Sequence, residues 1–272
     1  MLLMDLPVMK NCLMLGRVFF AVSMIASGLQ QLIRQDFVRL VPKLPSWIPA
    51  PSIWAVLSGV LLIVAGLAVL FERKRVQASI LLGALFVVVG LLYIPGVVGN
   101  PGAGYMWTNP CKTLALLGAT VILTSLPDHN NTRRTSSRVL PFGRASRIGA
   151  VLFGLFFVIG GIQHFVYSDF VMQLVPAWIP FPRFWAYFTG IALVAGGVGI
   201  NIKTTVSLAA ILSGVMVFLW VVLLHIPRAL AAAHDFGETS AIFEALALSG
   251  TAFLIAASGS NKPTPPSLPV AA

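Results

Sequence analysis

The chain has 272 residues, of which 58% are hydrophobic and only 10% are charged. Soluble globular domains carry about 25% charged residues, so this composition excludes an ordinary water-soluble globular fold. The formal net charge is +10, but the basic residues lie in short segments between apolar blocks. That distribution argues against a nucleic-acid partner, which needs a clustered basic face. The lipid bilayer is the expected partner.

Apolar segments long enough to cross a membrane follow one another along the chain. A spanning helix needs about 20 mainly apolar residues. The segments lack the period-2 alternation of barrel strands, so helices are expected. The predicted spans are 12–33, 53–71, 76–94, 112–126, 148–166, 184–202, 206–225 and 240–257, of which the fourth is the shortest.

Lys and Arg residues are distributed unevenly between the two sides that these spans define. Twelve of the 18 fall on the side that holds both termini and the segment between the fourth and fifth spans. Cytoplasmic loops of membrane proteins are enriched in Lys and Arg, so both termini are predicted to be cytoplasmic. The expected location is the inner membrane of a bacterial cell.

Two halves of the chain carry the same residues in the same order. The matched positions include Gly28/Gly161, Gln30/Gln163, Asp36/Asp169, Pro42/Pro176, Trp47/Trp178, Pro49/Pro180, Trp54/Trp185, Gly59/Gly190, Gly66/Gly197, Pro95/Pro227 and Gly118/Gly250. Such a series indicates an internal duplication. Each half has four predicted spans, an even number, so the halves should face the same way about a pseudo-two-fold axis along the membrane normal.

The predicted fold class is therefore an all-α membrane protein with eight transmembrane helices, arranged as two parallel-oriented four-helix repeats. The first repeat is expected over residues 1–126 and the second over 148–257. A basic cytoplasmic linker, 127–147, joins them. The Pro-rich composition of the tail, 258–272, predicts disorder.

An outer hairpin is expected after the first span of each repeat. Asp36 and Asp169 suit helix N-caps, which predicts a short interfacial or re-entrant helix behind each. Prolines then end the helix, and tryptophans mark the outer headgroup level. The hairpin should cap the bundle, with a ligand-binding lid as the alternative. Its further marker residues are Pro42, Trp47, Pro49 and Trp54 in the first half and Pro176, Trp178, Pro180 and Trp185 in the second.

Polar residues of the second half form a candidate polar site near the outer surface. The residues are His164, Asp169, His225, Arg228 and Glu244. Ionisable groups in a membrane are costly and often functional, and a neutral histidine can pass protons to a cofactor. Histidines at the membrane interface without a special role are the alternative. No catalytic residue is assigned, no metal site is predicted, and enzymatic activity stays undecided.

The first half differs at the positions that match the two histidines, where it has Gln31 and Tyr93. A histidine-dependent site would therefore be single. Lys112 matches Glu244 across the repeats. The favoured interpretation is that each caps its own helix at the outer surface, and the alternative is an ion pair between the halves near the axis.

Four motifs of the second half resemble the DoxX-like family of membrane proteins. They are G-G-x-Q-H-F at 160–165, D-F-V-x-x-L-V-P-x-W-I-P-x-P-x-x-W at 169–185, T-G-x-A-L-V-A-G-G at 189–197 and L-L-H-I-P-R at 223–228. The resemblance covers almost all of residues 12–257 as two fused four-helix units, and it fits the second half better than the first. The family offers no accepted catalytic residues to carry over.

The family takes its name from a membrane subunit of a thiosulfate:quinone oxidoreductase. The resemblance therefore implies an accessory or quinone-associated subunit of a membrane redox system, with quinone as the cofactor and a soluble or membrane oxidoreductase as the partner. The alternative is a non-enzymatic transporter of small molecules or lipids, or a membrane assembly factor. Fold-level analogy alone separates these functions poorly.

Overall fold

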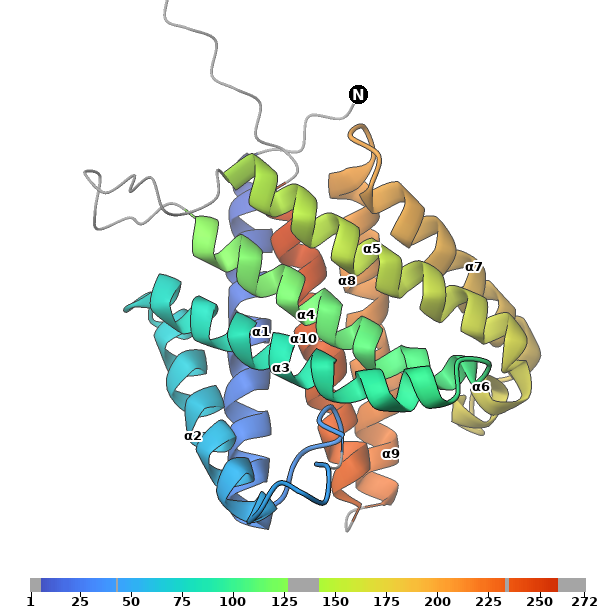
Figure 1. Cartoon of the computed structure of the whole chain (residues 1–272). Helices are drawn as coiled ribbons and strands as arrows, with labels where there is room; N and C mark the ends of the chain where they lie inside the picture. Colours follow the sequence, from blue (N-terminus) through green and yellow to red (C-terminus); the bar gives the residue numbers. More distant parts are fainter. Residues whose placement is uncertain (1–5, 43, 127–141, 233–234, 259–272) are drawn as a thin grey trace, which may run out of the picture.

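The structure is a computed structural model that describes residues 6–42, 44–126, 142–232 and 235–258 (Figure 1). Over these residues all regular structure is helical, as the composition predicts. The predicted linker and tail fall mainly on 127–141 and 259–272, outside the described residues, and α5 already begins within the predicted linker.

The first half forms four long helices. They are α1 (Leu6–Arg34), α2 (Pro51–Leu70), α3 (Arg75–Gly99) and α4 (Thr108–Ser125), with a short 3-10 turn, η1 (Gly104–Trp107), before α4. The second half is also built from helices, with more interruptions. Its elements are α5 (Phe142–Val166), α6 (Ser168–Leu174), α7 (Pro182–Ile200), α8 (Val206–Trp220), the π-helical turn η2 (Val221–His225), α9 (Ile226–Ala231) and α10 (Phe236–Ser258).

Seven helices of the described part are long and apolar enough to cross a membrane, the continuous α8–η2–α9 rod counting as one. The helix that does not qualify is α4, which corresponds to the predicted fourth span. Its 18 residues begin with a polar turn that contains Asn109 and Lys112. It packs against α3, α5 and α10, so its polar start lies among protein neighbours.

Helix α10 lies at the centre of the bundle, between α1 and α8 (Figure 1). Its side chains are buried almost without interruption from Ser240 to Ser258. The outer helices instead leave large apolar residues exposed, among them Val64 on α2 and Ile80 on α3. An apolar exterior around a packed centre is what a bilayer environment requires.

The two halves contact each other through matched helix crossings. Helix α1 packs against α10, and α5 packs against α4. A Cβ atom at Gly250 would lie 2.8 Å from the carbonyl oxygen of Gly16, and one at Gly118 would lie 3.0 Å from that of Gly149. The backbones touch at both crossings because small residues allow helices to approach closely in a membrane.

Hydrogen bonds between the halves are matched in the same way. Ser240 of α10 donates to the side-chain oxygen of Gln30 on α1 at 3.0 Å. Thr108 of α4 donates to the side-chain oxygen of Gln163 on α5 at 2.8 Å. The two glutamines are therefore placed alike, each tying the first helix of its own half to the last helix of the other half.

The outer segments differ from the prediction. Among the residues that the structure describes, only the second half has the short helix, α6, and its N-cap is Tyr167, with Asp169 inside the first turn. The chain after α1 turns at Gln35, whose φ is 53°, and no helix follows. Asp36 instead accepts a hydrogen bond from the backbone of Phe37 at 2.7 Å. Both N-cap predictions were wrong, because α1 ends in a left-handed residue and α5 runs almost directly into α6.

The proline–tryptophan part of each outer segment is alike in the two halves. Helices α2 and α7 each begin with a proline, where its missing N–H costs nothing. Trp54 donates its indole N–H to the Pro49 carbonyl at 3.2 Å, and Trp185 donates to the Pro180 carbonyl at 3.1 Å. Each segment is thus fastened to the helix that follows it.

Candidate functional site

Two pockets lie beneath the outer segments, one in each half. The first pocket has a volume of about 460 Å³ and is bounded by α1, α2, α3, α4, α10 and described residues of the segment after α1. The second pocket has a volume of about 550 Å³ and is bounded by α4, α5, α6, α8 and α10. Both volumes fall within the range of about 300–1,000 Å³ that is usual for small-molecule sites.

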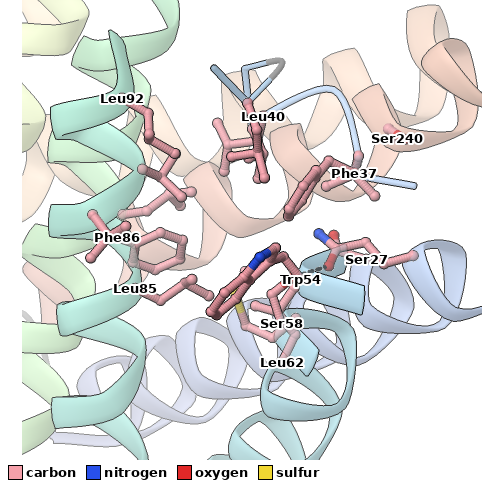
Figure 2. Close-up of a pocket in the computed structure, with 18 of the residues that line it drawn as sticks. Ser27, Phe37, Leu40, Trp54, Ser58, Leu62, Leu85, Phe86, Leu92 and Ser240 are labelled. Carbon is pink, nitrogen blue, oxygen red and sulfur yellow. Dashed lines mark hydrogen bonds between the residues drawn. The ribbon is translucent and has the colours of Figure 1, made fainter. Parts of the chain in front are cut away.

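The first pocket is lined mostly by apolar side chains. Phe37 and Leu40 enter from the segment after α1, Trp54 from α2, and Phe86 and Leu92 from α3, and these side chains face one common space (Figure 2). The segment after α1 therefore closes the pocket from outside with its own apolar residues.

Polar groups around the first pocket bond to one another. Ser58 donates to the side-chain oxygen of Gln31 at 2.7 Å. Tyr93, which lies beyond the lining, donates its hydroxyl to the Leu40 carbonyl at 2.6 Å and so holds the outer segment in place. The positions that match the two histidines of the second half are thus occupied by groups with protein partners.

The second pocket has aromatic walls. Phe156 and Phe157 of α5 and Trp220 of α8 line it. The ring of His164 lies nearly parallel to that of Trp220, with centroids 6.2 Å apart and an interplanar angle of 23°. The Nδ1 atom of His164 lies 2.8 Å from the Gly160 carbonyl oxygen. A carbonyl only accepts, so Nδ1 carries the proton, and Nε2 is the acceptor of the neutral ring.

The lining of the second pocket also includes His225, Lys112 and Arg39. His225 is the last residue of the π-helical turn η2, two residues before Pro227. Proline has no N–H and crowds the preceding turn, which a wider π turn accommodates. The Nδ1 atom of His225 is buried without a hydrogen-bond partner. Isolated π turns are frequent at functional sites, and an unpartnered buried nitrogen is costly.

Lys112 and Glu244 form an ion pair between the two halves. Lys112 Nζ lies 2.8 Å from Glu244 Oε2, and the two side chains are 16% and 9% exposed. The favoured interpretation, that each caps its own helix, was wrong, and the alternative pair is what the structure contains. Glu244 lines both pockets, and its Oε1 atom is buried without a partner.

The structure brings together three of the five residues of the candidate polar site. His164, His225 and Glu244 line the second pocket. Asp169 lies on α6 and is not part of the lining. Arg228 pairs with Glu238 at 2.5 Å, also outside the lining. Among the described residues, no cluster of His, Cys, Asp and Glu side chains could hold a metal ion.

Sequence reasoning did not include Arg39, Lys112 or Trp220 in this site. The opposite charges at the matched positions of Lys112 and Glu244 were a usable signal for the ion pair. Arg39 gave none, because it belongs to the outer segment of the first half and reaches the pocket of the second.

Comparison with known proteins matches each half to a different family model. The DoxX family model matches residues 12–96. The model described as Domain of unknown function (DUF8561) matches residues 153–260. The motif resemblance fitted the second half better, whereas the DoxX match falls on the first. No curated protein and no solved structure matches the chain. With its DoxX match and its apolar helices, the chain is a DoxX-like, multi-pass integral membrane protein.

Proposed function

We propose that this protein binds a quinone-type molecule in the second pocket, as an accessory or quinone-associated subunit of a membrane redox system. The observation that carries the proposal is the combination of aromatic side chains and hydrogen-bonding groups in the lining of one mostly apolar pocket. A quinone has the matching chemistry, because its flat ring carries two carbonyl acceptors and an apolar tail.

The described side chains could hold both redox forms of such a ring. Phe157 and Trp220 offer faces for stacking. Arg39 and His225 offer N–H donors to a quinone carbonyl, and His164 Nε2 offers an acceptor to a hydroquinone hydroxyl. The residues of this chain would thus bind and orient the ring, and electron transfer would require an oxidoreductase partner.

Fluorescence quenching tests the proposal directly. The full chain in lipid nanodiscs is titrated with decylubiquinone while tryptophan emission is followed. Saturable quenching is expected, and His225→Phe should weaken the apparent affinity about tenfold, the equivalent of one hydrogen bond of about 1.4 kcal/mol. Tyr93→Phe, at the matched position outside the second pocket, should leave the affinity unchanged. Quenching that never saturates would contradict quinone binding.

A lipid-binding or transport function has one observation in its favour. Arg39 and Lys112 face the pocket with only Glu244 against them, which leaves a positive balance that suits an anionic headgroup. Titration with phosphatidylglycerol in place of decylubiquinone separates the two functions. Saturable displacement of a bound fluorescent anionic lipid, with no response to quinone, would favour this second function.

We also infer that the chain is a duplicated unit, with the repeats at residues 1–126 and 148–257 and both termini in the cytoplasm of a bacterial cell. The matched glycine crossings and the matched glutamine bonds support the duplication. The excess of basic residues on one side supports the orientation. Single cysteines placed at Lys10 and Trp178, in a chain without its native cysteines, should differ in labelling by an impermeant maleimide on intact cells. Labelling at Lys10 but not at Trp178 would reverse the orientation.

A further inference from the structure

The quinone proposal concerns the second pocket and assigns no role to the first. It reaches from the surface of the bundle to its core. Trp47 and Val88 line it and are 79% and 53% exposed, whereas Phe86 and Leu116 line it and are 3% and 1% exposed. The pocket is therefore a deep space whose mouth lies on the apolar, lipid-facing surface.

Its interior makes few polar demands on an occupant. The side-chain oxygen of Gln31 is bonded by Ser58, and the indole N–H of Trp54 is bonded by the Pro49 carbonyl. Ser240 is bonded to Gln30. Glu244, the one carboxylate in the wall, pairs with Lys112 through Oε2, and only its Oε1 atom has no partner. The chain itself thus partners most of the polar groups that a water or a polar ligand would otherwise satisfy, and the greater part of the wall is apolar.

Water is a poor occupant for such a space, because a buried water needs two to four polar partners. An empty space is also unfavourable, since the side chains around it forfeit their dispersion contacts. The apolar surface at the mouth is surrounded by hydrocarbon in a bilayer. A flexible hydrocarbon chain can enter sideways at Trp47 and Val88 and reach Phe86 along a wall that is mostly apolar.

We propose that the first pocket is a lipid site that takes one acyl chain of a membrane phospholipid, entering between α2 and α3 beneath the segment after α1. The phospholipid headgroup stays at the outer surface beside Trp47, as tryptophans at the headgroup level favour. The site is separate from the second pocket, and the proposal does not depend on quinone binding there.

Photolabelling by a phospholipid with a diazirine near the end of one acyl chain tests the site. The full chain is reconstituted with this lipid, irradiated and mapped by mass spectrometry. Lipids that merely surround the protein can label only exposed residues. Labelling at Leu62, Phe86 or Leu116, which are at most 5% exposed, is the expected result. Labelling confined to exposed residues in the wild-type protein would overturn the proposal.

Two phenylalanine variants, placed two residues apart on α3, serve as test and control. Val89 lines the pocket and is 3% exposed, whereas Val87 is 46% exposed and does not line it. Val89→Phe should reduce labelling of the three buried residues at least fivefold, and Val87→Phe should leave it unchanged. Equal labelling in both variants would contradict the site. The wild-type map decides the question even if Val89→Phe fails to fold.

A quinone with the diazirine on its tail distinguishes the lipid from the other apolar molecule of the membrane. The phospholipid should label the buried residues of the first pocket in membranes that contain no quinone. Labelling of those residues by the quinone tail alone would assign the pocket to quinone and overturn the lipid proposal. Loss of quinone binding in the second pocket, by contrast, would leave the phospholipid labels in place.

Discussion

The first pocket and the second pocket lie beneath the outer segments of the two halves, and residues at matched sequence positions, Gln31 and His164, line them. Around the first, Gln31 and Tyr93 have protein partners. At the matching positions of the second, the Nδ1 atom of His164 bonds to a carbonyl of its own helix, and the Nδ1 atom of His225 has no hydrogen-bond partner. The comparison shows that the first half ties these positions to other parts of the protein by hydrogen bonds, whereas the second half does not. This difference supports the proposal that the second pocket binds a polar ligand.

The largest expected effect comes from the ion pair on which both halves depend. Lys112→Met should lower the free energy of unfolding by about 3–5 kcal/mol, because it leaves the Glu244 carboxylate buried without a counter-charge. Thermal unfolding in detergent measures the loss. The double variant Lys112→Met with Glu244→Leu should recover most of it, and a double variant as unstable as the single one would contradict the pairing.

The matched helix crossings should respond alike to added volume. Gly250→Ala and Gly118→Ala each place a methyl group at 2.8 to 3.0 Å from a facing backbone oxygen. Backbone gives way less easily than a side chain, so each should cost about 1–3 kcal/mol of unfolding free energy. Gly96→Ala on α3, which has open space around it, is the control. A large cost at one crossing and none at the other would break the equivalence of the halves.

Tyr93 and His225 should separate stability from binding. Tyr93→Phe removes the hydrogen bond to the Leu40 carbonyl and should cost about 1 kcal/mol of unfolding free energy. His225→Phe removes an atom without a partner and should leave the melting temperature unchanged or higher. Melting curves of the two variants in the same detergent give the answer. Equal losses of stability would mean that His225 has a structural partner in the folded protein.

The smallest effects are expected at the two indole hydrogen bonds of the outer segments. Trp54→Phe and Trp185→Phe should each cost about 0.5–1 kcal/mol, because each removes one partly exposed bond to a proline carbonyl. The rate of limited proteolysis after α1 and after α5 reports the loosening. A clearly larger effect at Trp54 would show that the segment over the first pocket depends more on this bond.

Composition and periodic apolar blocks were sufficient to predict the helical membrane fold and the positions of most helices. The matched glycines and glutamines were also visible in the sequence, because close helix crossings demand small residues at fixed places. The sequence did not show how the polar first turn of α4 is accommodated. That turn lies beside α10, where Lys112 pairs with Glu244. The absence of the predicted helix after Asp36 is explained by the left-handed conformation of Gln35, which no residue of the local motif indicates.

The candidate site was predicted in part for a similar reason. His164, His225 and Glu244 were recognised because ionisable residues stand out in apolar helices. Arg39 reaches the second pocket from the other half, so only the tertiary arrangement reveals it. Arg228 was assigned to the site by its place in the chain, but it lies one turn beyond the π-helical segment and pairs with Glu238.

The unequal roles of the two pockets are tested most directly by a quinone that carries a photoreactive azide on its ring. After irradiation of the full chain in nanodiscs, peptides containing Phe157, Trp220 or His225 should be labelled, and those containing Leu62 or Phe86 should not. Ring labels in both pockets, or in the first alone, would contradict the account.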